Sequence, residues 1–222
     1  MVGPGAQVLA GSTAFPQTKS TLPVKAEIIS SLAIVTRKMK SNKQHMLSVR
    51  FTTNLDSDNI CQLYSRTFPD SESESVAMLA SNLLHEITCP ETFALVAEQD
   101  NAVAGHIAFS PVTVERNESL RCYILAPLAV MPAWQRTGIG SRLIERGIEE
   151  LAKKNTDLLF VYGDPKYYGK FGFSAQAAAN YSPPYKLAHP FGWQAIALRR
   201  LGVSEQAGNI RCVVSLRDPR LW

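Results

Sequence analysis

The segment that covers residues 128–151 constrains the fold of this chain more than any other. An apolar stretch ends at Pro132, the turn from Gln135 to Gly140 contains two glycines, and residues 141–151 have the apolar spacing of a helix. A strand, a glycine turn and a helix in this order let the N–H groups of residues 136–141 converge at the positive end of the helix dipole. The segment therefore predicts an anion site, and a pyrophosphate suits it.

Two common nucleotide motifs are excluded at this turn. A Rossmann fingerprint requires a third glycine where this chain has Leu143, and an acidic residue at the ribose-binding offset is missing. A Walker A loop requires Gly-Lys-Ser/Thr, which is absent. The turn thus favours a phosphate-containing cofactor other than a nicotinamide dinucleotide or a nucleoside triphosphate. A glycine turn that binds no ligand is the alternative.

Length and composition indicate one domain, with or without a tail. The chain has 222 residues, of which 45% are hydrophobic. Its longest apolar runs, 32–35 and 126–131, are far shorter than the roughly 20 residues that cross a bilayer, so we expect no membrane partner. The cysteines Cys61, Cys89, Cys122 and Cys212 are widely separated, without a C-x-x-C pair or a histidine at metal spacing. This usage predicts a reducing compartment, cytosolic or organellar, with the cytoplasm preferred, and no bound metal.

The positive charge lies at the N-terminus. Residues 1–45 hold six basic residues against Glu27, whereas the remainder holds 17 basic and 18 acidic residues. The body thus has no electrostatic signature of nucleic-acid binding. We expect residues 1–45 to be a disordered basic extension and residues 46–222 to form the domain. The extension has three interpretations: a transit peptide, a functional basic arm, or an over-long start before Met46. The preponderance of lysine over arginine argues against a transit peptide, and the over-long start is preferred.

Periodicity predicts the elements of the domain. We expect a strand over 47–51, a helix from Asp56 or Ser57 to Phe68, and a helix over 73–86. A hairpin of strands 93–98 and 102–114 follows, then a strand over 120–130, the helix 139–154 and a strand over 158–162. A short helix is expected within 166–170. Strands over 193–198 and within 210–216 complete the chain as a last hairpin.

The turn also resembles a known family signature. The pattern Leu128-x-Val130-x-Pro132-x-x-Gln135-x-x-Gly138-x-Gly140 is similar to the acetyl-CoA-binding signature of the GNAT superfamily of N-acetyltransferases. Residues 163–173, with Tyr168-x-x-x-Gly172-Phe173, resemble its aromatic-rich second motif. Together with residues 105–111 and 126–130, they resemble the YhbS-like branch of small GNAT proteins. The similarity covers residues 46–222.

The resemblance implies an α/β fold with a mixed, mostly antiparallel central sheet of about seven strands, helices on both faces and a splayed central strand pair. In this fold the strand before the pyrophosphate loop separates from its neighbour, and Pro127 is expected at a bulge or an edge there. The pantetheine and thioester of acetyl-CoA would be held by Leu128, Ala129 and Val130. The pyrophosphate would be held by Gln135, Arg136, Thr137, Gly138, Ile139, Gly140 and Ser141, with a charge-assisted bond from Arg136.

The superfamily's usual proton donor corresponds to Tyr168. A phenol with a pKa near 10 stays protonated at neutral pH and can donate to the departing CoA thiolate. A packed aromatic is the alternative role for this side chain. The oxyanion would be held by an N–H near Leu128 or Ala129.

The general base is open. Glu98, His106 and Asp164 are the candidates, and relayed water is an alternative to all three. The apolar flanks of His106 favour a structural histidine, and Asp164, before a proline, suits a turn or a helix cap.

Four other side chains have structural interpretations. His85 and Glu86 are expected at a solvated helix end near the acceptor region. Trp134 is expected to brace the glycine turn, and Trp193 to pack in the last hairpin.

The sequence therefore predicts an acetyl-CoA-dependent N-acetyltransferase that transfers the acetyl group directly to a primary amine. Neither motif contains a cysteine that would carry a covalent intermediate. A non-catalytic acyl-CoA-binding or regulatory module is the alternative, and a targeting protein that binds acidic partners through its basic tail is another. A free amino acid, a polyamine, an antibiotic and a protein amine all remain possible acceptors, and the protein is expected to be a monomer or a homodimer.

Overall fold

The computed structural model describes residues 47–199 and 207–222, so the expectations for residues 1–45 lie outside the described residues. Its strands form one eight-stranded sheet in the order β1-β2-β3-β4-β5-β7, with β8 paired to β3 and β6 paired to β8. The strands are β1 (Leu47–Phe51), β2 (Phe93–Gln99), β3 (Ala102–Val114), β4 (Asn117–Val130), β5 (Leu158–Tyr162), β6 (Tyr181–Ser182), β7 (Trp193–Ala197) and β8 (Gly208–Cys212).

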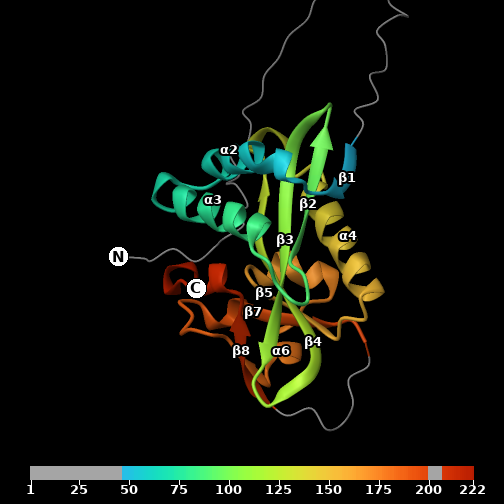
Figure 1. Ribbon diagram of the computed structural model, residues 1–222, viewed down its shortest axis with the longest axis vertical. Helices are drawn as coiled ribbons and strands as arrows, with labels where there is room; N and C mark the ends of the chain where they lie inside the picture. The colour runs from blue at the N-terminus through green and yellow to red at the C-terminus, as the bar shows by residue number, and fades with distance from the viewer. Residues whose placement is uncertain (1–46, 200–206) are drawn as a thin grey trace, which may run out of the picture.

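Helices cover both faces of the sheet, as Figure 1 shows. They are α2 (Ser57–Thr67), α3 (Asp70–His85), α4 (Ile139–Lys153) and the short α5 (Pro165–Tyr168) and α6 (Ala175–Ala178). Side chains alternate between the two faces along each strand. On β2, Val96 packs against α2 and α3, whereas Leu95 and Ala97 join the core beneath α4.

The predicted fold class is confirmed. The sheet is mixed and mostly antiparallel, because β4–β5 and β6–β8 are parallel pairs and the others are antiparallel. The predicted first hairpin is present. Asp100 and Asn101 form its turn with φ of 53° and 65°, the left-handed conformation that a type I′ hairpin turn requires at both central residues.

The second helix starts earlier than predicted, at Asp70 instead of residue 73. Pro69 precedes the helix with φ of −57°, and Asp70 and Glu72 occupy its first turn. A fixed helical φ and acidic side chains near the positive end of the dipole both stabilise this start.

The predicted last hairpin is wrong. Strand β7 pairs with β5, with Trp193 opposite Tyr162. Strand β8 pairs instead with β3, with Arg211 opposite Thr113. Alternating apolar residues indicate that a strand exists, but the open sheet edges available elsewhere determine its partner. Trp193, which was expected to pack in this hairpin, packs instead in the core, stacked on Phe160 with ring centroids 5.3 Å apart.

Among residues 47–199 and 207–222, no helix has the length and apolar character needed to cross a membrane.

Candidate active site

Strand β4 separates from β5 halfway along its length. The two strands pair from Cys122, opposite Leu158, to Leu125, opposite Val161. Beyond Leu125, β4 pairs only with β3, as far as Val130. Residues 126–130 therefore have a neighbouring strand on one side only, and we call the other side the free edge of β4. The predicted splay is confirmed.

Pro127 lies where the strands diverge. Leu128 is opposite Ile107 and Leu125 is opposite Phe109, so β4 carries one additional residue between these pairs. This irregularity is a β-bulge, which tolerates a residue without an N–H for the ladder. The expected position of Pro127 at a bulge is confirmed.

The direction of the backbone groups alternates along the free edge. Met131 N donates to Ala104 O at 2.8 Å, across the pair of Val130 and Gly105. In an antiparallel ladder this bond marks a non-hydrogen-bonded pair, so the backbone groups of Val130 and Leu128 point away from β3. Those of Ala129 point into the ladder. Leu128 and Val130 thus present hydrogen-bonding groups at the free edge, and Ala129 does not.

The glycine loop (residues 135–141) joins the end of β4 to α4. Arg136 and Gly138 have φ of 62° and 92°, and the left-handed conformation at Gly138 turns the chain into the helix. The first backbone bond of α4 runs from Arg142 N to Gly138 O at 3.0 Å. Within the part of the chain that the structure describes, the N–H groups of residues 136–141 donate no backbone hydrogen bond. They are the donors that an anion would use.

Side chains of the glycine loop have different positions. Gln135 Nε2 donates to Val130 O at 3.1 Å, so this side chain closes the loop onto the free edge. Thr137 Oγ1 donates to Trp134 O at 2.6 Å, and the half-buried side chain of Trp134 packs on the core beneath α4. Arg136 is exposed. Ile139 is 2% exposed and has only backbone groups to offer a ligand.

Two adjacent tyrosines face the glycine loop and the free edge. Asp164 caps α5 by accepting from Lys166 N at 2.9 Å, and this helix ends with Tyr167 and Tyr168. The Tyr167 hydroxyl hydrogen-bonds the Ser141 side chain at the start of α4. Tyr168 is 3% exposed, and burial raises its pKa well above 10. Tyr168 therefore stays protonated at neutral pH.

A cavity of about 460 Å³ opens beside the free edge of β4, and we call it the β4 cavity. Residues of α3, the end of β5, the C-terminal segment and Tyr168 line it together with residues 124–128. A ligand in this cavity would lie against both Leu128 and Tyr168. The structure thus brings Tyr168 and the free edge together, as the sequence predicted.

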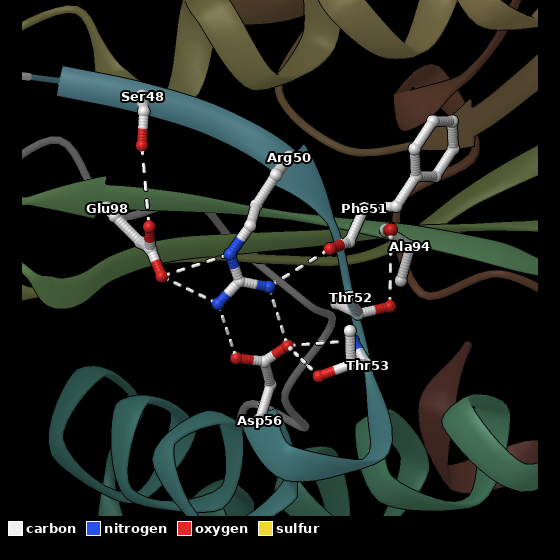
Figure 2. A network of polar contacts seen from close by, with 8 residues as sticks. All are labelled: Ser48, Arg50, Phe51, Thr52, Thr53, Asp56, Ala94 and Glu98. Atoms are coloured by element: carbon white, nitrogen blue, oxygen red, sulfur yellow. Dashed lines mark hydrogen bonds and ion pairs between the residues drawn. The ribbon is translucent and has the colours of Figure 1, made fainter.

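The three base candidates lie outside the lining of the β4 cavity. Figure 2 shows Glu98 accepting from Arg50 Nε at 3.0 Å. His106 is fully buried, and burial lowers its pKa to about 3. Asp164 is the cap of α5. The structural alternatives for His106 and Asp164 are confirmed.

The side-chain carboxylate in the cavity lining is that of Glu72, which the sequence interpretation missed. Glu72, Val76 and Leu79 all line the cavity, and their spacing places them on one face of α3. The signal that could have identified Glu72 is a glutamate that shares a helix face with apolar residues.

Glu86 corrects another expectation. His85 is exposed at the end of α3, as predicted. The Glu86 carboxylate, however, accepts from Val214 N at 2.8 Å and from Ser215 N at 3.1 Å. It therefore fixes the C-terminal segment that closes the β4 cavity, a contact between residues too far apart in sequence for a local pattern to reveal.

Comparisons with known proteins agree with this geometry. The profile of the acetyltransferase (GNAT) family matches residues 57–173. The N-acetyltransferase YjhQ of Escherichia coli strain K12 is 32% identical over 172 residues, which are 76% of this chain and 93% of YjhQ. The structure of the GNAT family N-acetyltransferase YhbS from Escherichia coli in complex with CoA has a TM-score of 0.68 and 26% identity, and the match covers 77% of this chain and 92% of that chain.

A GNAT family acetyltransferase from Brucella melitensis in complex with acetyl-CoA has a TM-score of 0.56 and 28% identity, over 77% of this chain and 98% of that chain. The matched segment includes the bulge at Pro127, the glycine loop and Tyr168. The splayed β4, the glycine loop and these relatives lead to one conclusion: the chain belongs to the GNAT family of acetyltransferases.

Proposed function

We propose that this acetyltransferase uses acetyl-CoA and transfers the acetyl group directly to a primary amine, without a covalent enzyme intermediate. One observation carries the proposal: the free edge of β4 runs from the β4 cavity, which Tyr168 lines, to the unpaired N–H groups of the glycine loop. An extended arm with an anionic end fits this edge and loop in a single orientation, with its reactive end at the cavity.

The binding roles follow from the directions of the backbone groups. Leu128 and Val130 add the pantetheine arm to the sheet as an extra strand would be added. The N–H groups of residues 136–141 receive the pyrophosphate at the start of α4, and exposed Arg136 adds a charge-assisted bond. Relatives with CoA and with acetyl-CoA bound support this choice of cosubstrate.

The transfer step uses two groups of this chain. The neutral amine attacks the thioester carbon, the N–C bond forms, and Leu128 N–H stabilises the negative charge on the carbonyl oxygen. The C–S bond then breaks, Tyr168 gives its proton to the departing thiolate sulfur, the nitrogen releases a proton to solvent, and the Tyr168 phenolate regains a proton from solvent. A phenol whose pKa is raised by burial keeps the proton that this step needs.

Location belongs to the proposal as well. Cys61, Cys89 and Cys212 carry free thiols, and free thiols are usual in the reducing cytoplasm. We place the enzyme there.

The test is release of free thiol from acetyl-CoA against a library of primary amines. Tyr168→Phe should lower kcat by about 10²–10³-fold, the typical contribution of a positioned proton donor, and should change the Kd for acetyl-CoA by less than threefold. Tyr123→Phe is the matched control, because this hydroxyl bonds Glu91 O at 3.1 Å outside the cavity lining. Unchanged turnover in Tyr168→Phe would remove this residue from the mechanism. Binding of acetyl-CoA with no release across the library would instead indicate a non-catalytic acyl-CoA-binding module.

A further inference from the structure

The wall that α3 contributes to the β4 cavity has one charged side chain. Glu72, Ser75, Val76 and Leu79 lie along one face of this helix and line the cavity. Glu72 is partly buried. Burial raises the pKa of its carboxyl group, although a position in the first turn of a helix stabilises the ionised form. The effect of burial on the pKa of Glu72 is therefore larger than the opposite effect of the helix N-terminus.

Glu72 has no cationic partner among the described residues. The other charged side chain in the lining is Arg220, and it is already paired. Its Nε donates to both carboxylate oxygens of Asp218 at 3.0 Å, and its side chain is 80% exposed. The cavity thus contains an uncompensated negative charge, which a cationic ligand would neutralise.

The rest of the cavity is mostly apolar. Leu79, Ile124, Leu128, Leu221 and Trp222 are among the lining residues. A volume of about 460 Å³ lies within the usual range for small-molecule sites, roughly 300–1,000 Å³. The lining therefore matches a ligand with one cationic end and an apolar body.

We propose that the acetyl acceptor is a small primary amine with an aromatic or aliphatic body, and that Glu72 binds its ammonium group before this group releases a proton to solvent and attacks as the neutral amine. This inference rests on the proposed function. It disfavours a free amino acid, because the α-carboxylate would lie close to Glu72 without a free cation to pair with. It also disfavours a polyamine, because a second ammonium group would be buried among apolar side chains without a partner.

The test measures binding, so that it does not depend on turnover. Phenethylamine is titrated by calorimetry into the full-length protein saturated with CoA. Glu72→Gln should raise the Kd for phenethylamine at least tenfold, whereas Glu74→Gln, on the exposed side of the same helix, should leave it unchanged. The Kd for CoA should be the same in all three proteins, which shows that both variants are folded.

Two ligand series separate the charge from the apolar body. The neutral isostere 2-phenylethanol should bind the wild type at least tenfold more weakly than phenethylamine, and Glu72→Gln should abolish this preference. From propylamine to hexylamine, affinity should rise about fourfold per methylene, the value expected for complete burial. Spermidine and phenylalanine should bind more weakly than phenethylamine.

The outcomes separate the two proposals. An equal Kd for phenethylamine in the wild type and Glu72→Gln would overturn the role of Glu72, even if thiol release proceeds with other amines. Tighter binding of spermidine or phenylalanine would overturn the acceptor class. Loss of phenethylamine affinity in Glu72→Gln, without acetylation of any amine, would support the binding site and contradict the proposed enzyme activity.

Discussion

The Tyr64 hydroxyl lies 2.9 Å from Nδ1 of His106. This contact joins α2 to β3, the strand that pairs with residues 126–130 of β4. Both side chains are fully buried, and His106 is opposite Ala129 in the ladder. Burial lowers the pKa of His106 to about 3, although the charge of Asp56 acts in the opposite direction. The imidazole is therefore neutral at pH 7 and acts as a structural partner of Tyr64.

The first prediction concerns acid stability. The unfolded chain protonates His106 near pH 6.5, with the usual pKa of histidine, whereas the folded protein protonates it only near pH 3. Its contribution to the free energy of unfolding is complete above pH 6.5 and is lost as the pH falls toward 3, by at most about 1.4 kcal/mol per pH unit. Urea denaturation between pH 7.5 and 4.5 should show a shallower pH dependence in His106→Gln than in the wild type.

The control for this prediction is His85→Gln, because His85 is exposed at the end of α3. This variant should keep the wild-type pH dependence. If the free energy of unfolding changes equally with pH in His106→Gln and in the wild type, the lowered pKa of His106 is contradicted.

The second prediction concerns the network in Figure 2. Arg50 donates to Asp56 Oδ2 at 2.8 Å and to Oδ1 at 2.7 Å, and these bonds are the largest cause that lowers the pKa of Asp56 to about 2. Asp56 is 4% exposed. Arg50→Met should lower the free energy of unfolding by about 2–3 kcal/mol, because it leaves a buried carboxylate without its cation.

Two further variants test this interpretation. Adding Asp56→Asn to Arg50→Met should recover part of the loss, since the unpaired charge is then absent. Arg211→Met removes the exposed Arg211–Glu115 ion pair and should have a much smaller effect. Equal losses from Arg50→Met and Arg211→Met in urea denaturation would show that burial of Asp56 is unimportant.

Local elements were predictable from the sequence, because their signals lie within a few residues. The strand at 158–162 and the start of α4 after Gly138 agree with the prediction. The left-handed φ of Gly138 explains why the glycine pattern identified the loop. Both depend on backbone conformation and periodicity, which neighbouring residues determine.

Long-range pairing was not predictable in the same way. The β4 cavity combines α3, β4, β5 and the C-terminal segment, and only the folded chain brings Glu72 and Tyr168 to one space. The contact of Glu86 with Ser215 and the partners of β7 and β8 are likewise products of packing. A polar residue among apolar ones indicates a position on a helix face, but the sequence does not specify what that face covers.

The third prediction concerns the glycine loop. A Cβ added at Gly140 would lie 2.5 Å from the Tyr167 hydroxyl oxygen, so Gly140→Ala forces Tyr167 away from the start of α4. We expect the Kd for acetyl-CoA to rise roughly tenfold, or about 1.4 kcal/mol. Tyr167→Phe in the same protein removes the obstructing oxygen and should restore most of the affinity in a calorimetric titration.

Gly169→Ala is the matched control for Gly140→Ala, because nothing lies within 4 Å of a Cβ built at Gly169. It should bind acetyl-CoA as the wild type does. If the Tyr167→Phe substitution gives no recovery in the Gly140→Ala protein, the steric explanation fails.

The last prediction concerns the packing of α4 on β3. A Cβ added at Gly147 would lie 1.9 Å from Phe109 Cζ, and Phe109 is fully buried. At an exposed helical site, replacing glycine by alanine stabilises a protein by about 1 kcal/mol. Ala152→Gly, at an exposed position of α4, is the control, because its loss of stability measures the same difference in helix propensity. Overpacking costs about 1–3 kcal/mol and should dominate at Gly147, so urea denaturation should show that Gly147→Ala is destabilised. Phe109→Leu should lower the free energy of unfolding less in the Gly147→Ala protein than in the wild type. If the losses of the two single variants add up to the loss of the double variant, the clash is contradicted.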